Sequence, residues 1–303
     1  MSTLFIVDGY SILFRTYYSV GEMTTSKQIP IGGIFGFIRS ILTLIQRYSV
    51  EHLVITLDSG KKTFRSEIYP QYKANRIACP EDLIPQFDIL LEFLETSNIC
   101  HSRKEGFEAD DIIASITKQE STKKISVVTS DKDLMQLVDE RVNCLDFFKG
   151  KFYASEDVME KFGLMPKNIV DYLALLGDAS DNIPGVKGCG EKGAVKLIQE
   201  FGSVENIIAN INNISNNRLR KAMEQHHQSA TLSKELASLR FDVPLQPLHF
   251  DISSINCDNL RKFIEKYEMK SLFYMCNKFE KQQNQPQKNL ENKKPTLTQG
   301  QLF

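Results

Sequence analysis

Carboxylate side chains follow the predicted strands of this 303-residue chain. Asp8, Asp58 and Asp131 come just after short apolar runs that have the composition of buried strands. In an open α/β sheet, sites form at the edge where the carboxyl ends of the strands meet. Six further acids occupy predicted loops and helix starts: Glu108, Asp110, Asp111, Asp133, Asp178 and Asp181. We therefore predict one acidic pocket built from these nine carboxylates.

So many carboxylates cannot stay ionised side by side without cations, because like charges repel. Only five histidines occur, and none has zinc-ligand spacing with a cysteine. Oxygen-only ligands favour Mg²⁺, for which Mn²⁺ can substitute. Two such ions, about 3.5–4 Å apart, are a standard device for phosphodiester hydrolysis, since they activate water and stabilise charge at phosphorus. Taken singly, each acid also has a simpler interpretation as a helix N-cap or as part of a plain turn.

The first half of the chain alternates between strand and helix patterns. Apolar, β-branched runs predict strands at 3–8, 53–58, 125–129 and 142–148. Apolar residues at helical spacing predict helices at 32–48, 84–96 and 108–119, and the start of another at 134–138. This alternation predicts an α/β fold with a mostly parallel mixed sheet and helices on both faces.

From residue 155 the pattern becomes helical. Ser155 is a suitable N-cap for a helix at 156–162, and Pro166 suits the first turn of a helix at 167–176. From residue 280 the chain is rich in Gln, Asn, Lys and Pro, which predicts disorder. We divide the chain into an α/β domain, a helical domain and a tail, at 1–154, 155–277 and 278–303.

The bulk composition narrows the class of protein. Hydrophobic residues make up 42%, charged residues 25%, and the net charge is −1, which excludes a uniformly basic nucleic-acid binder. Six cysteines form no C-x-x-C pair, which predicts reduced thiols and a cytosolic protein. We expect neither a signal peptide nor a membrane span, because no basic start and no apolar stretch of sufficient length occurs.

Three multi-residue motifs resemble those of the 5′-nuclease family: Gly106–Asp111, Thr129–Leu134 and Leu176–Gly185. The resemblance covers about residues 3–277 and is strongest to the 5′→3′ exonuclease domain of bacterial DNA polymerase I. It implies Mg²⁺-dependent hydrolysis near the 5′ ends of branched, nicked or flap DNA and of RNA primers. It also implies a helical arch segment at about 60–97 and a helix–hairpin–helix DNA-binding module at about 167–202.

The same resemblance implies how the acids divide between two metal ions. One cluster takes Asp58, Glu108, Asp110, Asp111 and Asp131. The other takes Asp133, Asp178 and Asp181, and Asp8 lies at the base of both.

Cations and aromatic rings crowd the segment that follows Asp58. On pattern alone, Lys61, Lys62 and Arg65 either lie in a solvated loop or track phosphates while rings stack on bases. The run Tyr72–Arg76 resembles the family signature at the foot of the arch. That resemblance implies that Lys73 and Arg76 are catalytic groups acting on the scissile phosphate and that Tyr72 stacks near the unpaired end. Arg15 resembles a further phosphate contact.

Gly188-x-Gly190-x-x-Gly193 has dinucleotide-fingerprint spacing, but no apolar strand precedes it. We interpret it as a hairpin between two helices, whose amides and following helix N-terminus, with Lys192, would hold a duplex phosphate. A plain interhelical turn is the alternative. The resemblance further implies a K⁺ ion bound by backbone carbonyls of Val186, Gly188 and Gly190.

The last residues resemble a bacterial sliding-clamp binding peptide through Gln299, Leu302 and Phe303, although so short a match also arises by chance. A flexible tether would raise the local concentration of such a peptide. No polymerase domain follows in this sequence. We therefore expect a free-standing, monomeric bacterial protein, cytoplasmic and nucleoid-associated, that is recruited to DNA.

Together these features predict a structure-selective 5′→3′ exonuclease and flap endonuclease of DNA replication and repair. A metal-dependent ribonuclease of a related class would share the strand-end acids but not the arch segment or the hairpin. A catalytically silent binder of branched DNA would not need the complete set of acids. A Mg²⁺ phosphatase with an aspartyl nucleophile would need a second Asp two positions after Asp8, where Tyr10 stands.

Overall fold

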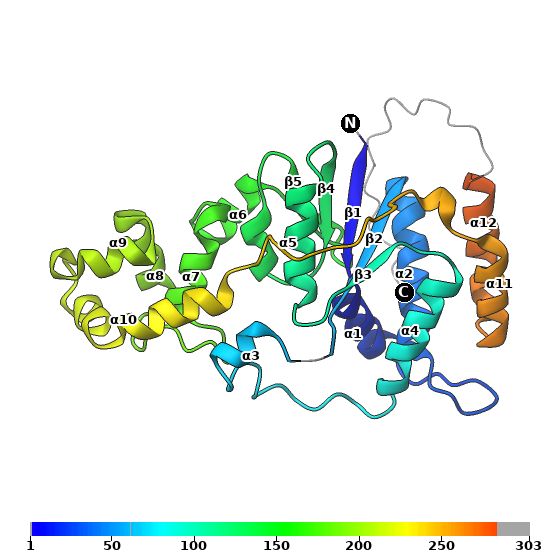
Figure 1. Cartoon of the computed structure of the whole chain (residues 1–303), viewed down its shortest axis with the longest axis horizontal. Helices are drawn as coiled ribbons and strands as arrows, with labels where there is room; N and C mark the ends of the chain where they lie inside the picture. Colours follow the sequence, from blue (N-terminus) through cyan, green and yellow to red (C-terminus); the bar gives the residue numbers. More distant parts are fainter. Residues whose placement is uncertain (1, 61, 284–303) are drawn as a thin grey trace.

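The computed structural model describes residues 2–60 and 62–283. Its centre is a six-stranded sheet with the strand order β3-β2-β1-β4-β5-β6 (Figure 1). The strands are β1 (Thr3–Asp8), β2 (His52–Leu57), β3 (His101–Arg103), β4 (Lys124–Val128), β5 (Val142–Asp146) and β6 (Lys151–Tyr153). All neighbouring pairs are parallel except β5 and β6, which are antiparallel. The prediction of a mostly parallel mixed sheet is confirmed.

The register of the central strands explains why the acids meet. In β1, Asp8 stands opposite Thr56 of β2, and Val7 stands opposite both Ile55 of β2 and Val128 of β4. The three strands therefore end level with one another. Asp58 and Asp131, which follow β2 and β4, emerge at the same edge as Asp8.

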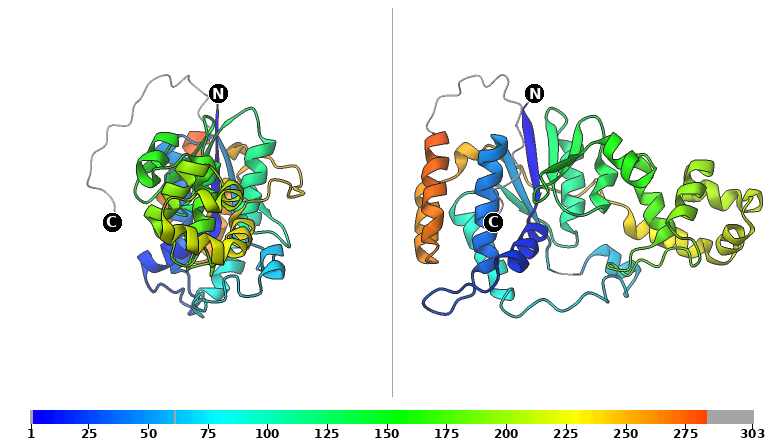
Figure 2. Two further views of the ribbon diagram at one scale, coloured as in Figure 1. Left: turned by 90° about the vertical axis from the view of Figure 1, so that its left-hand side faces the viewer. Right: turned by 180° about the vertical axis from the view of Figure 1, so that it is seen from behind.

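Helices cover both faces of the sheet (Figures 1 and 2), as the alternating pattern predicts. Side chains of β1 alternate between two apolar cores, with Leu4 and Ile6 in one and Phe5 and Val7 in the other. The Phe5 face packs against α1 (Gly9–Val20), α2 (Gly32–Tyr48), α4 (Ile84–Thr96), α11 (Cys257–Lys266) and α12 (Phe273–Gln283). The Leu4 face packs against α5 (Ala109–Gln119) and α7 (Ile169–Leu176), and its core continues into the second half of the chain.

The first two helices approach each other closely because Gly36 has no side chain. A Cβ at Gly36 would lie 2.6 Å from the Cβ of Thr16 in α1. The Thr16 hydroxyl donates a hydrogen bond to the Gly33 carbonyl at 2.9 Å. This packing holds α1, which carries Asp8 at its N-cap, firmly against the sheet.

The second half extends away from the sheet as a group of helices (Figure 1). These are α6 (Ser155–Phe162), α7, α8 (Glu191–Phe201), α9 (Val204–Ala209) and α10 (Asn217–Ala237), with 3₁₀ helices η2 (Pro166–Asn168) and η3 (Ile211–Asn213). The chain then returns along the sheet through η4 (Ile252–Ser254) and η5 (Lys270–Leu272), and α11 and α12 pack beside α4 and α2. The division at residues 154 and 277 stays a prediction. It assigns α11 and the start of α12 to the helical domain, although both helices pack against the core of the first unit.

Several local predictions need adjustment. The helix expected from 134 is only the 3₁₀ helix η1 (Asp133–Leu137), because β5 begins soon after it. Ala154 rather than Ser155 is the N-cap of α6, and the Asp157 carboxylate accepts from the Ala154 amide at 3.0 Å. Within the arch segment, α3 (Phe64–Ile68) and α4 are helical, and residues 69–83 form turns and extended chain. None of the described helices is long and apolar enough to cross a bilayer.

Candidate active site

Asp8 links the start of α1 to the loop after β4. One carboxylate oxygen accepts from the Ser11 amide at 3.2 Å, as expected of a helix N-cap. The other accepts from the Thr129 hydroxyl at 3.1 Å, and the same hydroxyl accepts from the Asp131 amide at 3.0 Å. Asp8 is therefore a helix cap and a pocket acid at once, and Thr129 fixes its position relative to Asp131.

The end of β2 and the start of α5 meet at Asp58. Its carboxylate accepts from the Ala109 amide at 2.8 Å, the first residue of α5. Asp110 follows in the first turn of that helix. This contact brings the acids of the motif Gly106–Asp111 to the sheet edge that carries Asp8.

Four carboxyl groups at this edge have raised pKa values, and we call them the strand-end acids: Asp8, Asp110, Asp131 and Asp133. Burial, then the charges of Asp58 and Asp131, raise the pKa of Asp8 to about 7. Burial, then Asp131 and Asp178, raise the pKa of Asp133 to about 8. The pKa of Asp110 is well above its ordinary value for the same reasons, with Asp131 and Asp8 as its charged neighbours.

Asp131 keeps part of its surface exposed, yet its pKa is also raised. Loss of water within the pocket is the main cause, and the charges of Asp181 and Asp178 add to it against a hydrogen bond from the Asp133 amide. All the predicted acids except Asp111 take part in these mutual charge effects on pKa. The structure therefore places them close to one another.

The loop acids, Asp178 and Asp181, face this edge from the turn after α7. They line a hollow of about 360 Å³ with these residues: Arg76, Ser130, Asp131, Lys132, Asp133, Lys161 and Ser180. Lys132 Nζ lies 2.9 Å from the Asp178 carboxylate, and the Ser180 amide donates to it at 2.8 Å. Although burial acts the other way, the hydrogen bonds from Ser180 and Lys132 lower the pKa of Asp178.

Three residues of the predicted arch foot lie over the pocket. Lys73 Nζ is 2.8 Å from Glu108 Oε1 and 3.7 Å from Asp181 Oδ2, and Arg76 is 2.6 Å from Asp181 Oδ1. The Tyr72 hydroxyl lies 3.1 Å from Glu108 and 3.2 Å from Asp181. Burial lowers the pKa of Lys73, but the charges of Glu108 and Asp181 outweigh it, so the amine stays charged.

Arg65 and Asp111 differ from the prediction. The guanidinium of Arg65 makes a bidentate pair with Asp111 at 2.7 and 2.8 Å, and it also donates to the carbonyls of Leu236 and Ser238 at 2.8 and 2.9 Å. Arg65 is 2% exposed and Asp111 is fully buried. Arg65 therefore cannot reach a phosphate, because its donors are already used in hydrogen bonds and it is closed off from solvent. Asp111 is the permanent ion-pair partner of Arg65 and lies behind the pocket.

The donor chemistry of the pocket fits a hard divalent cation. Within residues 2–60 and 62–283, no three His, Cys, Asp or Glu side chains are already arranged to hold a metal ion. The acids share a pocket but do not form a metal coordination shell, since several of them are paired with lysine or arginine side chains. Yet the available donors are oxygens, four carboxyls resist ionisation, and Asp133 Oδ1 is buried without a hydrogen-bond partner in the described structure. Divalent cations would relieve each of these conditions.

The remaining predicted contacts lie outside the pocket. Lys192 is exposed and lines a second hollow with Gly188 and Gly190, beside the N-terminus of α8. The Val186 carbonyl accepts from the Cys189 amide at 2.9 Å within this hairpin. Arg15 and Lys62 are exposed. Lys61, Gln299, Leu302 and Phe303 lie outside the described residues.

Sequence reasoning missed three groups at the pocket. Thr129 connects Asp8 to Asp131, Lys132 pairs with Asp178, and Lys161 lines the hollow. Lys132 carried a signal, because it stands between two predicted pocket acids. Thr129 opens one of the predicted motifs, but its contact with Asp8, 121 residues away, is not visible in the sequence. No sequence signal identified Lys161.

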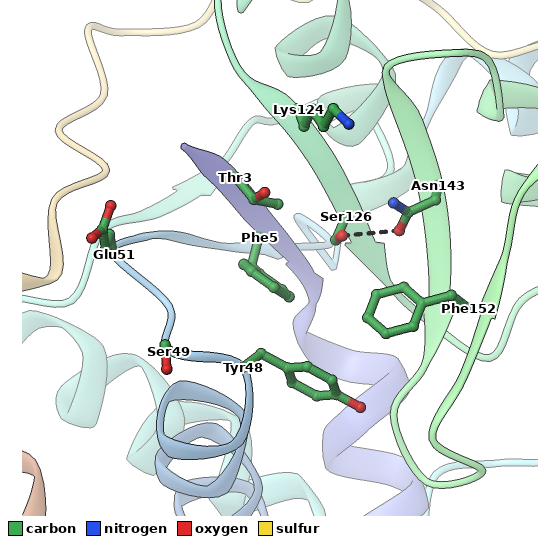
Figure 3. Close-up of a pocket in the computed structure, with 9 residues that line it drawn as sticks. All are labelled: Thr3, Phe5, Tyr48, Ser49, Glu51, Lys124, Ser126, Asn143 and Phe152. Atoms are coloured by element: carbon green, nitrogen blue, oxygen red, sulfur yellow. Dashed lines mark hydrogen bonds between the residues drawn. The ribbon is translucent and has the colours of Figure 1, made fainter. Parts of the chain in front are cut away.

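Another hollow lies at the opposite edge of the sheet, beside the amino ends of β1 and β4 (Figure 3). Phe5, Tyr48 and Phe152 line it, and the Ser126 hydroxyl donates to Asn143 at 2.9 Å. Glu51 is its one carboxylate. Its lining therefore does not fit the metal chemistry of the acidic pocket.

Comparison with known proteins gives the family. A model described as 5′-3′ exonuclease, N-terminal resolvase-like domain, matches residues 3–163, and one described as 5′-3′ exonuclease, C-terminal SAM fold, matches residues 164–263. The chain belongs to the 5′-3′ exonuclease family, a class of nucleases. The resemblance identified in the sequence is thus confirmed.

Two relatives show how the chain compares in length. It is 35% identical over 287 residues to the 5′-3′ exonuclease of Aquifex aeolicus, covering 94% of this chain and 99% of that protein. It is 35% identical over 271 residues to thermostable DNA polymerase I of Thermus thermophilus, covering 89% of this chain but only 32% of the polymerase. The chain therefore spans about a third of the polymerase it matches.

Among solved structures, the bacteriophage T5 5′-exonuclease with bound divalent metal ions (zinc) shares this fold. The TM-score is 0.67 at 25% identity, and the match covers 88% of this chain and 98% of that one. The mixed α/β architecture with its helical second half is accordingly that of a 5′-exonuclease.

Proposed function

We propose that the protein is a structure-selective 5′→3′ exonuclease and flap endonuclease that uses two Mg²⁺ ions, for which Mn²⁺ can substitute. The observation that carries the proposal is the single pocket in which the strand-end acids and loop acids face the cations of residues 72–76. The metal-bound T5 5′-exonuclease, which has the same fold, supports a divalent cofactor.

The pocket offers two sets of oxygen ligands. Asp58, Glu108, Asp110 and Asp131 would hold one ion, Asp133, Asp178 and Asp181 the other, and Asp8 would lie at the base of both. When bound, such ions supply a water of lowered pKa and positive charge beside the phosphorus. Asp111 is left out of both sets because Arg65 occupies it.

Lys73 and Arg76 would act on the scissile phosphate. Their present partners, Glu108 and Asp181, are carboxylates within the pocket. A phosphate and divalent ions arriving together would replace these ion pairs, leaving the amine and the guanidinium to face the phosphate oxygens. Tyr72 is 9% exposed and its hydroxyl lies between the same two acids, so its ring would have to turn out of the core to stack on the base at the unpaired end.

Duplex binding would take place at the hairpin before α8. Exposed amides at a helix N-terminus and the Lys192 side chain suit a phosphate. A K⁺ ion held by the carbonyls of Val186, Gly188 and Gly190 would complete this contact. Arg15, Lys61 and Lys62 would grip other phosphates of the branched substrate.

The biological setting is also part of the proposal. RNA primers would be processed like DNA ends, and Gln299, Leu302 and Phe303 would bind a sliding clamp. The protein would be monomeric, cytoplasmic and nucleoid-associated. Deletion of residues 299–303 should abolish clamp pull-down and spare cleavage of free flaps, and unchanged pull-down would refute the clamp contact.

Cleavage of a 5′-labelled flap substrate tests the function directly. We expect cleavage near the junction with Mg²⁺ or Mn²⁺ and none with EDTA. Tight flap binding without cleavage under any metal would instead identify a silent binder of branched DNA. Cleavage of single-stranded RNA with no dependence on the flap would identify a ribonuclease.

A further inference from the structure

Helix α10 contacts the proposed duplex site, the buried Arg65 and the loop that carries two of the pocket acids. Near its start, Arg218 and Leu219 line the hollow at the hairpin with Gly188, Gly190 and Lys192. At its end, the Leu236 carbonyl accepts from buried Arg65 at 2.8 Å. Between these ends, α10 packs along α7 and reaches the loop that carries Asp178 and Asp181.

The loop between α7 and the hairpin is closed on itself. Asp178 and Ile183 exchange two backbone hydrogen bonds, at 2.9 and 2.8 Å. A Cβ on Gly185 would lie 2.4 Å from the Gly177 nitrogen, and φ is positive at both glycines. The two ends of the loop are thus in direct backbone contact, so the position of Gly185 sets the position of the loop acids.

Two serines of α10 hold Gly185. The Gly185 amide donates to the Ser233 hydroxyl at 2.9 Å, and the Ser229 hydroxyl donates to the Gly185 carbonyl at 2.7 Å. Ser233 is fully buried. The two residues are one helical turn apart, so both hydroxyls face the same way. Both backbone polar groups of Gly185 are therefore satisfied by one helix.

The helix axis is interrupted just before these serines. At His226 the backbone leaves helical geometry, with φ −128° and ψ 17°. The kink separates the part of α10 that lines the hairpin hollow from the part that holds Gly185. One element therefore contacts both the proposed duplex site and the acidic loop, on either side of a bend.

We propose that Ser229 and Ser233 are positioning residues that set Asp178 and Asp181 relative to the strand-end acids. The inference rests on the proposed function, since it takes the loop acids as ligands of a divalent ion. Groups that orient metal ligands without touching the metal typically contribute about 10- to 100-fold to affinity or activity. The serines act on the loop acids alone, because the strand-end acids are held by the sheet, Thr129 and α5.

The experiment compares four variants of the full chain. Ser229→Ala removes the donor to Gly185, and Ser229→Thr keeps the hydroxyl at a half-buried position. Ser233→Ala removes the acceptor. Thr231→Ala is the matched control, because Thr231 is exposed on the same helix and its hydroxyl donates to the His227 carbonyl at 3.2 Å rather than to Gly185.

Titration with Mn²⁺ without DNA, followed calorimetrically, is the primary readout. We expect Ser229→Ala and Ser233→Ala to weaken one of two Mn²⁺ sites by about 10-fold or more, and to leave the other within about twofold. Ser229→Thr should restore wild-type binding, and Thr231→Ala should match it. In flap cleavage, the serine variants should need more Mg²⁺ for half-maximal rate while their affinity for flap DNA stays unchanged.

The outcomes separate this inference from the proposed function. If the wild-type chain binds Mn²⁺ and cleaves flaps but Ser229→Ala binds both ions like wild type, the positioning role is wrong. Equal weakening of both sites, or a loss that Ser229→Thr does not rescue, would indicate general destabilisation and would also overturn it. If the wild-type chain neither binds Mn²⁺ nor cleaves, the proposed function itself has failed. Should Ser233→Ala not fold, the Ser229 pair decides the question.

Discussion

The strand-end acids and the loop acids share one pocket, but their negative charge is compensated in different ways. The strand-end acids are held at a rigid sheet edge, and their pKa values are raised by burial and by one another. The loop acids are paired with cations, since Lys132 contacts Asp178 and Arg76 contacts Asp181. Within the described residues, the strand-end acids make no ion pair, whereas both loop acids already do.

The Arg65–Asp111 pair is a third arrangement, in which the cation is permanent. It is buried and bidentate, whereas Arg76 beside Asp181 is largely exposed. The comparison indicates that the exposed pairs can exchange their cations for a metal ion and a phosphate. A buried pair cannot do so, because separating it would leave two unpaired charges away from water.

The largest effect is expected at the strand-end acids. Asp131→Asn keeps the shape of the side chain but removes the charge of an acid that makes no ion pair within the described residues. We expect kcat on a flap substrate to fall by about 1000-fold, the scale of losing a principal charge-stabilising group. Flap-DNA affinity should stay near wild type in a gel-shift titration. Substantial remaining turnover would contradict the role of Asp131 and weaken the contrast between the two sets of acids.

The permanent pair should affect stability rather than substrate binding. Arg65→Met leaves the Asp111 carboxylate buried without its cation, although the Glu108 and Arg240 amides still donate to it, and this should lower the free energy of unfolding by about 3–5 kcal/mol. Urea denaturation measures the loss. Flap-DNA affinity of the folded variant should change by less than about twofold. The control is Lys62→Met in the same segment, since an exposed lysine should alter stability by at most about 0.5 kcal/mol. A large loss of DNA affinity with unchanged stability would return Arg65 to the substrate-binding residues.

A smaller effect is expected where the cation is exchangeable. Lys73→Ala removes a charge that faces Glu108 and Asp181 before the substrate arrives. We expect the single-turnover rate of flap cleavage to fall by about 100-fold while flap affinity changes only a few-fold. Equal losses in rate and affinity would mean that Lys73 provides electrostatic grip alone.

The smallest expected effect is a pH-dependent change in the melting temperature of the metal-free protein. The pKa of Asp133 is raised from 3.8 to about 8, so the folded state keeps a proton that the unfolded chain loses. Stability from this group is complete below pH 3.8 and is lost as pH rises through about 8. Asp133→Asn does not titrate. It should therefore melt about 2–4 °C above wild type at pH 8 in EDTA, the equivalent of about 1 kcal/mol.

The same measurement at about pH 3 is the control, because Asp133 is then below its unfolded pKa of 3.8 and largely protonated in both states, so the two proteins should melt together. Saturating Mg²⁺ at pH 8 should reverse the order, because the wild-type carboxylate then has a cation. A variant that melts below wild type at pH 8 in EDTA would mean that the ionised Asp133 carboxylate does not destabilise the metal-free fold.

The sequence predicted the elements whose own residues carry a strong pattern. The apolar stripe of α2 and the β-branched runs of β1, β2 and β4 appear within a few residues of the expected bounds. The short strands β3 and β6 were missed because three residues are too few to show a period. Strand β3 is moreover polar, since His101, Ser102 and Arg103 form it.

The grouping of the acids could be predicted from the sequence, because the carboxyl ends of parallel strands meet at one edge of the sheet. Residue type and order along the chain were enough to bring Asp8, Asp58 and Asp131 together. Only the tertiary structure decided which acids have no cation partner, which have an exchangeable one and which have a permanent one. Arg65 and Asp111 are 46 residues apart, and Ser233 lies 48 residues from Gly185. Such pairings depend on how helices pack across the core, and no local spacing encodes them.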